Sequence, residues 1–203
     1  MKIFFPFAAT DIGGTSVFSR RFTAGMEARG HEVFYEYRED YDVLFMIVQA
    51  PFQYLVDAKR RGKPIIQRLD GVYYWTVAGW KFPLYNLKAA LARHCFTDFT
   101  IYQSEYSRAC AKRFLGPKLH DTSTLIYNGV DTNLFTPEGP TLALRDNPDQ
   151  ALFFSSSDFR REDQIIPIIQ ALDAYRERYG DNFKFLIAGE FRSQAAHIPT
   201  TYR

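Results

Sequence analysis

The chain has 203 residues, of which 46% are hydrophobic and 24% are charged. This is the composition of a globular protein with enough apolar side chains for a core and enough length for more than one domain. A formal net charge of +2 gives no electrostatic reason to expect a nucleic-acid partner. The longest apolar runs fall far short of the ~20 residues of a membrane-spanning helix, and the first residues lack the features of a signal peptide.

Short apolar runs alternate with helical patterns along the first two thirds of the chain. This alternation is typical of βαβ units and predicts an α/β fold with a Rossmann-like parallel sheet. The continuous apolar run 43–48 is what a strand buried on both faces requires. The strands are expected at residues 3–7, 31–35, 43–48, 64–69, 99–102 and 123–127.

The helices between these strands carry recognisable start signals and apolar faces. Thr15 or Ser16 is expected to cap the first helix, and Ser104 is expected to cap a later one. The first helix should bury a face at four-residue spacing, formed by Phe18, Phe22 and Met26. The helix that begins near Pro83 is expected to bury a stripe formed by Leu84, Leu87, Leu91 and Cys95.

A change of composition after residue 135 indicates a second unit. Residues 136–150 include three prolines, a glycine and an asparagine and have few large apolar groups, as linkers do. We therefore expect a first domain at residues 1–138, a linker at 139–150 and the incomplete start of a second Rossmann-like domain at 151–203. That second unit should contain a strand at 151–154, a helix near 163–179 and a strand at 183–188. Pro167 must lie in the first turn of this helix or bend it.

The turn after the first strand contains a glycine pair, Gly13 and Gly14. Glycines let a backbone approach a ligand closely, and the N-terminus of the following helix favours an anion. The spacing is not that of the dinucleotide-binding G-x-G-x-x-G fingerprint. A tight turn without a ligand explains the pair equally well.

A second candidate site follows the strand that ends near Leu69. Ligands of open α/β sheets bind beyond the carboxyl ends of the strands, which is where Arg68 and Asp70 stand. The Asp70 carboxylate could serve as a catalytic base or accept hydrogen bonds from hydroxyl groups. The aromatic loop 70–82 could provide stacking surfaces for a sugar or contacts for a lipid, through Tyr73, Tyr74, Trp75 and Trp80. The alternative is a turn at Asp70 with aromatic side chains that cover the edge of the domain.

Two further segments contain candidate ligand-binding residues. Asn128 lies in an Asn-Gly turn after the last strand of the first domain, where a structural turn and a ligand contact are both open. Arg160 and Arg161 precede the helix of the second unit and could bind a diphosphate, or form a solvated basic turn. The histidines and the two cysteines, Cys95 and Cys110, show no metal-ligand spacing, so no metal is expected, and a reducing compartment is favoured.

Several segments together resemble glycosyltransferase family 4, whose members have the GT-B fold. The glycine pair is followed by Arg-Gly-His-Glu-Val at 29–33, which resembles the opening of that family. Residues 101–107 resemble its v-x-x-S-x-y segment, and 183–189 resemble a strand of its second domain that ends in glycine. The most specific likeness is Tyr127-Asn128-Gly129-Val130-Asp131, continued to Pro137, which is close to the family's hinge sequence NGVD-x-x-x-F-x-P.

This resemblance implies transfer of a sugar from a nucleotide-sugar to a glycan or lipid-linked acceptor, with retention of the anomeric configuration and without a metal or other cofactor. The first domain of such enzymes mainly holds the acceptor and the second holds most of the donor. A cytoplasmic location is implied, with peripheral contact to the inner membrane face as an option. Asp163 stands where the family has a lysine, so Arg160 or Arg161 would have to replace it.

The resemblance also implies that a C-terminal part is missing, because the family's paired glutamates and nucleotide-binding helix would follow Arg203. The chain is then expected to be a fragment, a natural truncation or one part of a split enzyme. The competing hypothesis is a non-catalytic carbohydrate- or protein-binding module derived from a glycosyltransferase. Another nucleotide-binding α/β enzyme is disfavoured by the missing dinucleotide fingerprint.

Overall fold

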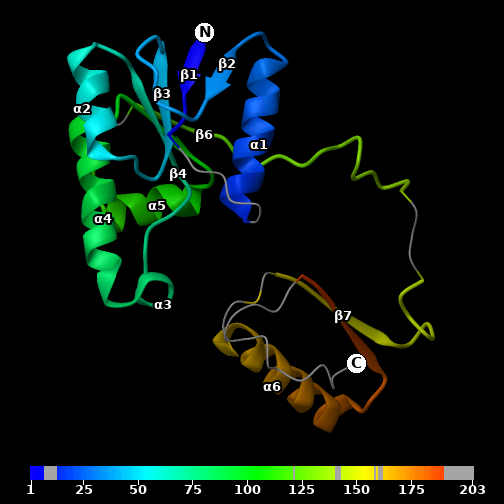
Figure 1. Ribbon diagram of the computed structural model, residues 1–203. Coiled ribbons are helices and arrows are strands. Elements are labelled where there is room, and N and C mark those ends of the chain that lie inside the picture. Colours follow the sequence, from blue (N-terminus) through cyan, green and yellow to red (C-terminus); the bar gives the residue numbers. More distant parts are fainter. Residues whose placement is uncertain (7–12, 121, 140–142, 158, 160–161, 190–203) are drawn as a thin grey trace. The chain divides into compact units, whose positions relative to one another are not determined.

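The computed structural model describes residues 1–6, 13–120, 122–139, 143–157, 159 and 162–189 (Figure 1). The chain divides into two compact units, Met1–Val130 and Asp131–Arg203. Both are α/β units with parallel sheets, and the predicted Rossmann-like α/β fold is confirmed.

The first unit is built on a six-stranded parallel sheet in the order β2-β1-β3-β4-β5-β6. The chain first adds β2 on one side of β1 and then crosses to add β3 on the other side. The direction in which strands are added therefore reverses at β1. Open α/β sheets bind their ligands beyond the carboxyl ends of the strands, typically where the strand order reverses. The strands are β1 (Lys2–Phe4), β2 (Glu32–Phe34), β3 (Val43–Ile47), β4 (Ile65–Leu69), β5 (Phe99–Tyr102) and β6 (Ser123–Leu125).

Helices cover both faces of this sheet (Figure 1). The helix α1 packs against one face, and α2 with the segment after α4 packs against the other. The α5 helix packs with α4 over the end of β4 and β5. The helical elements are α1 (Gly14–Glu27), α2 (Phe52–Arg60), α3 (Trp75–Ala78), the 3₁₀ turn η1 (Gly79–Lys81), α4 (Phe82–Leu91), the π turn η2 (Ala92–Phe96) and α5 (Glu105–Phe114).

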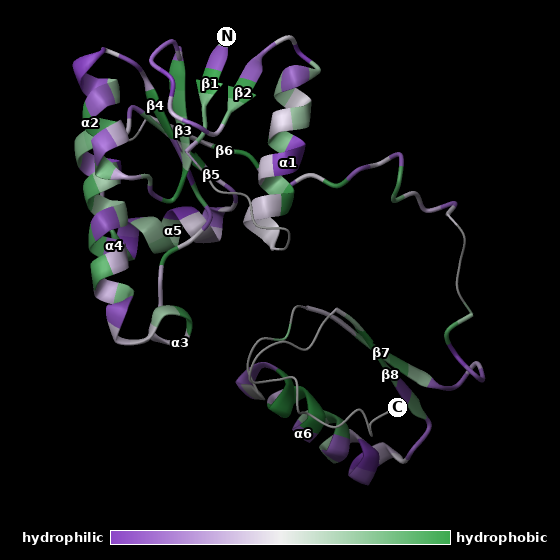
Figure 2. Ribbon diagram, in the orientation of Figure 1, coloured by the Kyte–Doolittle hydropathy of each residue, from purple (hydrophilic) through white to green (hydrophobic). Residues whose placement is uncertain are grey.

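The β3 strand shows why this sheet needs helices on both faces. All five of its residues are buried, as the continuous apolar run predicts. Successive side chains point to opposite faces, so Phe45 joins the cluster under α1 while Leu44 and Met46 join the cluster under α2. The hydropathy colouring of Figure 2 shows strands that are hydrophobic along this core. The expected α1 face is confirmed, since Phe18, Phe22 and Met26 pack against the same cluster as Phe45.

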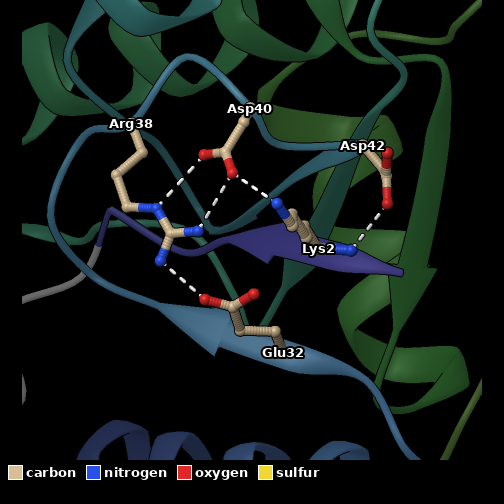
Figure 3. Close-up of polar contacts among 5 residues, drawn as sticks. All are labelled: Lys2, Glu32, Arg38, Asp40 and Asp42. Carbon is tan, nitrogen blue, oxygen red and sulfur yellow. Dashed lines mark hydrogen bonds and ion pairs between the residues drawn. The ribbon is translucent and has the colours of Figure 1, made fainter.

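A charged network joins the amino ends of β1 and β2 to the segment before β3 (Figure 3). The Arg38 guanidinium donates to both Asp40 carboxylate oxygens, at 3.2 Å each, and to Glu32 at 2.6 Å. Lys2 donates through its backbone nitrogen to Asp42 at 2.6 Å and through Nζ to Asp40. The three hydrogen bonds from the Arg38 guanidinium and the Lys2 ammonium group hold the pKa of the Asp40 carboxyl well below its usual range. The side chains of the ion pairs are 41–51% exposed, so each pair adds little stability.

The helix start signals had different outcomes. Ser104 caps α5 as expected: its hydroxyl accepts a hydrogen bond from the Ser107 N–H at 3.0 Å, and the Ser107 hydroxyl accepts one from the Ser104 N–H at 3.2 Å. The expected cap of α1 by Thr15 or Ser16 is wrong. The N-cap residue is Gly13, which has no side chain to cap the helix.

The orientation of α4 also differs from the prediction. Leu84, Leu87 and Leu91 are 49%, 55% and 42% exposed, and Cys95 is exposed as well. The buried face of α4 is instead formed by the small and polar residues Asn86 and Ala89. The expected loop 70–82 contains α3 and η1. Helical periodicity identified a stripe, but the stripe faces away from the core.

The second unit pairs β7 (Ala151–Ser156) with β8 (Phe183–Ala188) in parallel, with α6 (Glu162–Tyr179) between them in the chain. Its small core contains Phe159 and Ile165. Pro167 lies inside α6, not in its first turn.

Candidate functional site

The candidate site lies at the carboxyl edge of the six-stranded sheet, where β4, β5 and β6 end side by side. Parallel pairing places Arg68 beside Ile101, and Leu69 beside Tyr102. The residues that follow these strands therefore begin at one edge, although they are far apart in the sequence. This edge is opposite to the charged network of Figure 3, which joins the amino ends of the strands.

Arg68 is the centre of this site. It is only 4% exposed, yet its guanidinium contacts three polar residues from different segments. Nη1 donates to Asp70 Oδ2 at 2.8 Å, and Nη2 donates to Gln103 Oε1 at 3.1 Å and to Asn128 Oδ1 at 3.0 Å. These partners follow β4, β5 and β6 in turn. A buried guanidinium with several acceptors is how Arg preorganises a polar site.

The partners of Arg68 are also bonded to one another. Asn128 Nδ2 donates to Gln103 Oε1 at 2.9 Å, and Gln103 Nε2 donates to the Asp70 carbonyl oxygen at 2.6 Å. Gln103 thus links the two residues that the sequence singled out. Sequence reasoning missed Gln103, although its position gives a signal: like Asp70, it is the first residue after a parallel strand.

The helix α1 reaches the same site. The Arg68 guanidinium carbon lies 3.7 Å from the centre of the Phe18 ring, in the second turn of α1. This is a close cation–π contact. The helix begins at Gly14, after Gly13 at a φ of 117°, a conformation that side-chain-bearing residues rarely adopt. Among the described residues, which exclude 7–12, no atom lies within 4 Å of a Cβ built at Gly14.

The end of β3 is strained where it meets Arg68. Val48 has a φ of 59°, which is unfavourable for a β-branched residue. The Gln49 N–H donates to the Ile47 carbonyl at 2.6 Å, so the three residues form a tight γ-turn. The Val48 N–H donates to the Arg68 carbonyl at 2.8 Å, and its own carbonyl accepts from Gln67 Nε2 at 2.6 Å. Strain of this kind costs about 1–3 kcal/mol and clusters at functional sites.

Burial controls the ionisation of the Arg68–Asp70 pair. It raises the pKa of the Asp70 carboxyl, and the nearby Arg68 charge offsets only part of that effect. It also lowers the pKa of Arg68, again partly offset by its partner. Both pKa shifts favour the neutral form of the group concerned. Desolvation by burial therefore outweighs the attraction between the two charges.

The two carboxylate oxygens of Asp70 are not equivalent. Oδ2 accepts a hydrogen bond from Arg68, whereas Oδ1 lies 2.7 Å from the same nitrogen without hydrogen-bond geometry. Oδ1 is buried, and no group in the described part of the chain donates a hydrogen bond to it. A carboxylate with a raised pKa and an oxygen without a donor suits acceptance of a hydrogen bond or a proton from a hydroxyl group. The Asp70 side chain as a whole is 22% exposed.

The aromatic residues after Asp70 make structural contacts. The side-chain amide of Asn86 on α4 makes two hydrogen bonds to the Tyr73 backbone. Its oxygen accepts from the Tyr73 N–H at 2.8 Å, and its nitrogen donates to the Tyr73 carbonyl at 2.9 Å. The Tyr74 hydroxyl donates to the Cys110 sulfur on α5 at 3.5 Å, and this contact is the first cause of a raised Tyr74 pKa. Trp75 is 65% exposed. A role for these rings in sugar binding stays a prediction.

Some sequence candidates lie elsewhere or outside the described residues. Arg160 and Arg161, the proposed diphosphate ligands, fall outside the residues that the structure describes. Within the described ranges, no three His, Cys, Asp or Glu side chains gather as a metal site would require. In the same part of the chain, no helix is both long and apolar enough to cross a membrane.

Comparison with known proteins defines the fold. No protein-family model matches this chain, and no curated protein is significantly similar to it. Among solved structures, HepE of Anabaena in complex with UDP-glucose is similar at a TM-score of 0.53 and 14% identity, over 94% of this chain and 70% of HepE. HepE in complex with UDP and glucose is similar at a TM-score of 0.50 and 13% identity, with the same coverage. At this level of identity, the likeness shows a shared fold.

Proposed function

We propose that this chain is a nucleotide-sugar-dependent glycosyltransferase of GT-B type, or part of one, that transfers a sugar with retention to a glycan or lipid-linked acceptor. The observation that carries the proposal is the likeness of fold, over 94% of the chain, to a protein whose structure holds UDP-glucose. The segments that resemble family 4 also support the proposal. One of them, the hinge-like sequence, contains Asn128, whose side chain accepts a hydrogen bond from Arg68 at the candidate site.

In this proposal, the carboxyl edge of the first unit holds the acceptor. Asp70 accepts a hydrogen bond or a proton from the acceptor hydroxyl, which the raised pKa of its carboxyl favours. Arg68 acts as a positioning residue, because its guanidinium holds Asp70, Gln103 and Asn128 in one arrangement. Tyr73, Tyr74 and Trp75 contribute contacts on the acceptor side.

The donor is bound through its phosphates. The start of α1 at Gly13 and Gly14 offers backbone N–H groups and the positive end of a helix dipole. A separate proposal, made from the sequence alone, assigns diphosphate binding by charge-assisted hydrogen bonds to Arg160 and Arg161 of the second unit. Cationic groups of this kind can stabilise a departing nucleoside diphosphate without a metal ion.

The test measures release of nucleoside diphosphate from a panel of nucleotide-sugars that includes UDP-glucose, with and without glycan and lipid-linked acceptors. The protein should be used at its full natural length, and product stereochemistry should be read by NMR. Acceptor-dependent release is expected. Saturable binding of glycans without release from any donor would replace the transferase with a carbohydrate-binding module.

A further inference from the structure

The outward-facing leucine stripe of α4 lies next to α3 and η1, which contact α4 and carry further exposed apolar residues. Six large apolar residues between positions 75 and 91 are exposed, by 42–73% each: Trp75, Val77, Trp80, Leu84, Leu87 and Leu91. The three leucines follow one another at spacings of three and four residues and so share one face of the helix. We refer to these six residues as the α3–α4 surface. Soluble proteins rarely leave so many adjoining large apolar residues uncovered without a partner.

Charge identifies the kind of partner. The whole chain is nearly balanced, with 25 basic and 23 acidic residues, but residues 71–97 contain no Asp or Glu at all. Lys81 and Lys88 are exposed in this stretch, on η1 and α4. The Lys81 Nζ lies 5.6 Å from the centre of the Trp80 ring. An apolar face whose own segment carries basic but no acidic side chains is complementary to a surface that is apolar in depth and negative at its boundary.

The neighbouring helix strengthens the positive charge. Tyr74, directly before α3, contacts Cys110 and Phe114 of α5. The α5 helix carries one acidic residue, Glu105, which is paired with Arg108 at 3.5 Å. Two more basic side chains, those of Lys112 and Arg113, are exposed on this helix. The α5 helix, which contacts the residue directly before α3, thus adds net positive charge.

We propose that the α3–α4 surface docks the protein onto the interface of an anionic lipid bilayer. Trp75 and Trp80 then lie at the level of the headgroups, where Trp is favoured, and the leucine stripe of α4 enters the acyl boundary. Lys81 and Lys88 extend toward anionic headgroups while their apolar stems stay on the surface. A protein partner is less favoured. Protein interfaces are depleted of Lys at their core, and a protein partner does not explain why residues 71–97 contain no acidic side chain.

Membrane docking does not require the proposed reaction, but it has a consequence for it. Only four residues separate Asp70 from Trp75. Docking through the α3–α4 surface therefore brings the carboxyl edge of the sheet close to the membrane. An acceptor carried on a lipid would be within reach of Asp70 in that arrangement.

The chain provides its own reporter for this docking. It has two tryptophans, Trp75 and Trp80, and both belong to the α3–α4 surface. The intact protein is mixed with vesicles of phosphatidylcholine alone or of phosphatidylcholine and phosphatidylglycerol in equal parts. Tryptophan emission, acrylamide quenching and co-sedimentation are measured. We expect a blue shift, reduced quenching and binding with the anionic vesicles, and weaker binding as salt increases.

Two matched pairs of variants locate the contact. Lys81→Gln with Lys88→Gln should weaken binding roughly 25-fold, since each basic residue near an anionic surface contributes about fivefold. Arg60→Gln with Arg145→Gln removes the same charge from exposed positions elsewhere and should bind as the unaltered protein does. Leu84→Ser with Leu87→Ser should weaken binding and leave both reporters in place. The control for that pair is Leu119→Ser with Leu134→Ser, at positions 97% and 70% exposed.

Three results would overturn the proposal. One is an unchanged tryptophan emission with anionic vesicles under low-salt conditions. A second is equal loss of binding in the α3–α4 variants and their matched controls. The third is tryptophans that are already shielded from acrylamide without vesicles, which would assign the surface to a second copy or another part of the protein. Because none of these readouts uses a sugar donor, they leave the transferase proposal untouched.

Discussion

Replacement of Arg68 by methionine should strongly destabilise the first unit. The change preserves much of the apolar stem but removes the partner of the Asp70 carboxylate and three hydrogen bonds. Removing one member of a buried ion pair typically costs about 3–5 kcal/mol. The Asp70 side chain is 22% exposed, so its charge is partly hydrated, and we expect the lower end of that range, about 3 kcal/mol.

A second substitution separates the buried charge from the other contacts. Asp70→Asn in the Arg68→Met background removes the uncompensated carboxylate, so the double variant should be more stable than the single one by at least about 1 kcal/mol. The deficit of the single variant should also shrink at low pH. Its unpaired carboxyl has a pKa above the unfolded value, and stability is therefore lost as pH rises through that pKa.

Urea unfolding followed by tryptophan fluorescence measures these differences. Trp75 and Trp80 both lie in the first unit, so their emission reports the unfolding of that unit. The exposed Arg60→Met is the matched control and should change stability by less than about 0.5 kcal/mol. A cost below about 1 kcal/mol for Arg68→Met would place the pair among solvated surface pairs and refute the reasoning. A double variant no more stable than the single one would assign the loss to hydrogen bonding and to the Phe18 contact.

Three further predictions concern other features of the chain. Asp70→Asn should lower turnover of the full-length protein more than its stability. The folded state raises the pKa of the Asp70 carboxyl, so this group contributes stability at low pH that is lost as pH rises above its unfolded pKa. Asp70→Asn should remove this pH dependence, which is measured as the difference between the urea midpoints of the two proteins across a pH series. Ser104→Ala should cost about 1 kcal/mol in thermal unfolding, whereas Thr15→Ala, at a helix start without a side-chain cap, should not. Alanine at both Arg160 and Arg161 should weaken nucleoside diphosphate binding by ~1.5–3 kcal/mol per lost hydrogen bond in calorimetry; unchanged affinity would reject that role.

The sequence determined most of the local structure of this protein. The β3 strand was readable as a continuous apolar run, because a strand buried on both faces favours apolar residues throughout, and all five of its residues are buried. The Ser104 cap was readable because a hydroxyl before a helix can satisfy only nearby N–H groups. That Asp70 and Asn128 would lie at one edge of the sheet was also readable, since the residues after parallel strands gather there.

Tertiary structure decided which residues meet and which faces are covered. The Arg68 guanidinium contacts Gln103 and Asn128, which lie 35 and 60 residues away along the chain, and only strand order brings them together. Helical spacing showed that Leu84, Leu87 and Leu91 share a face, but spacing does not state what lies opposite that face. The core accepted the small side of α4, with Ala89 and Asn86, because helices with small contact residues can pack closely against their neighbours. The leucines were therefore left on the surface, where they form part of the proposed docking site.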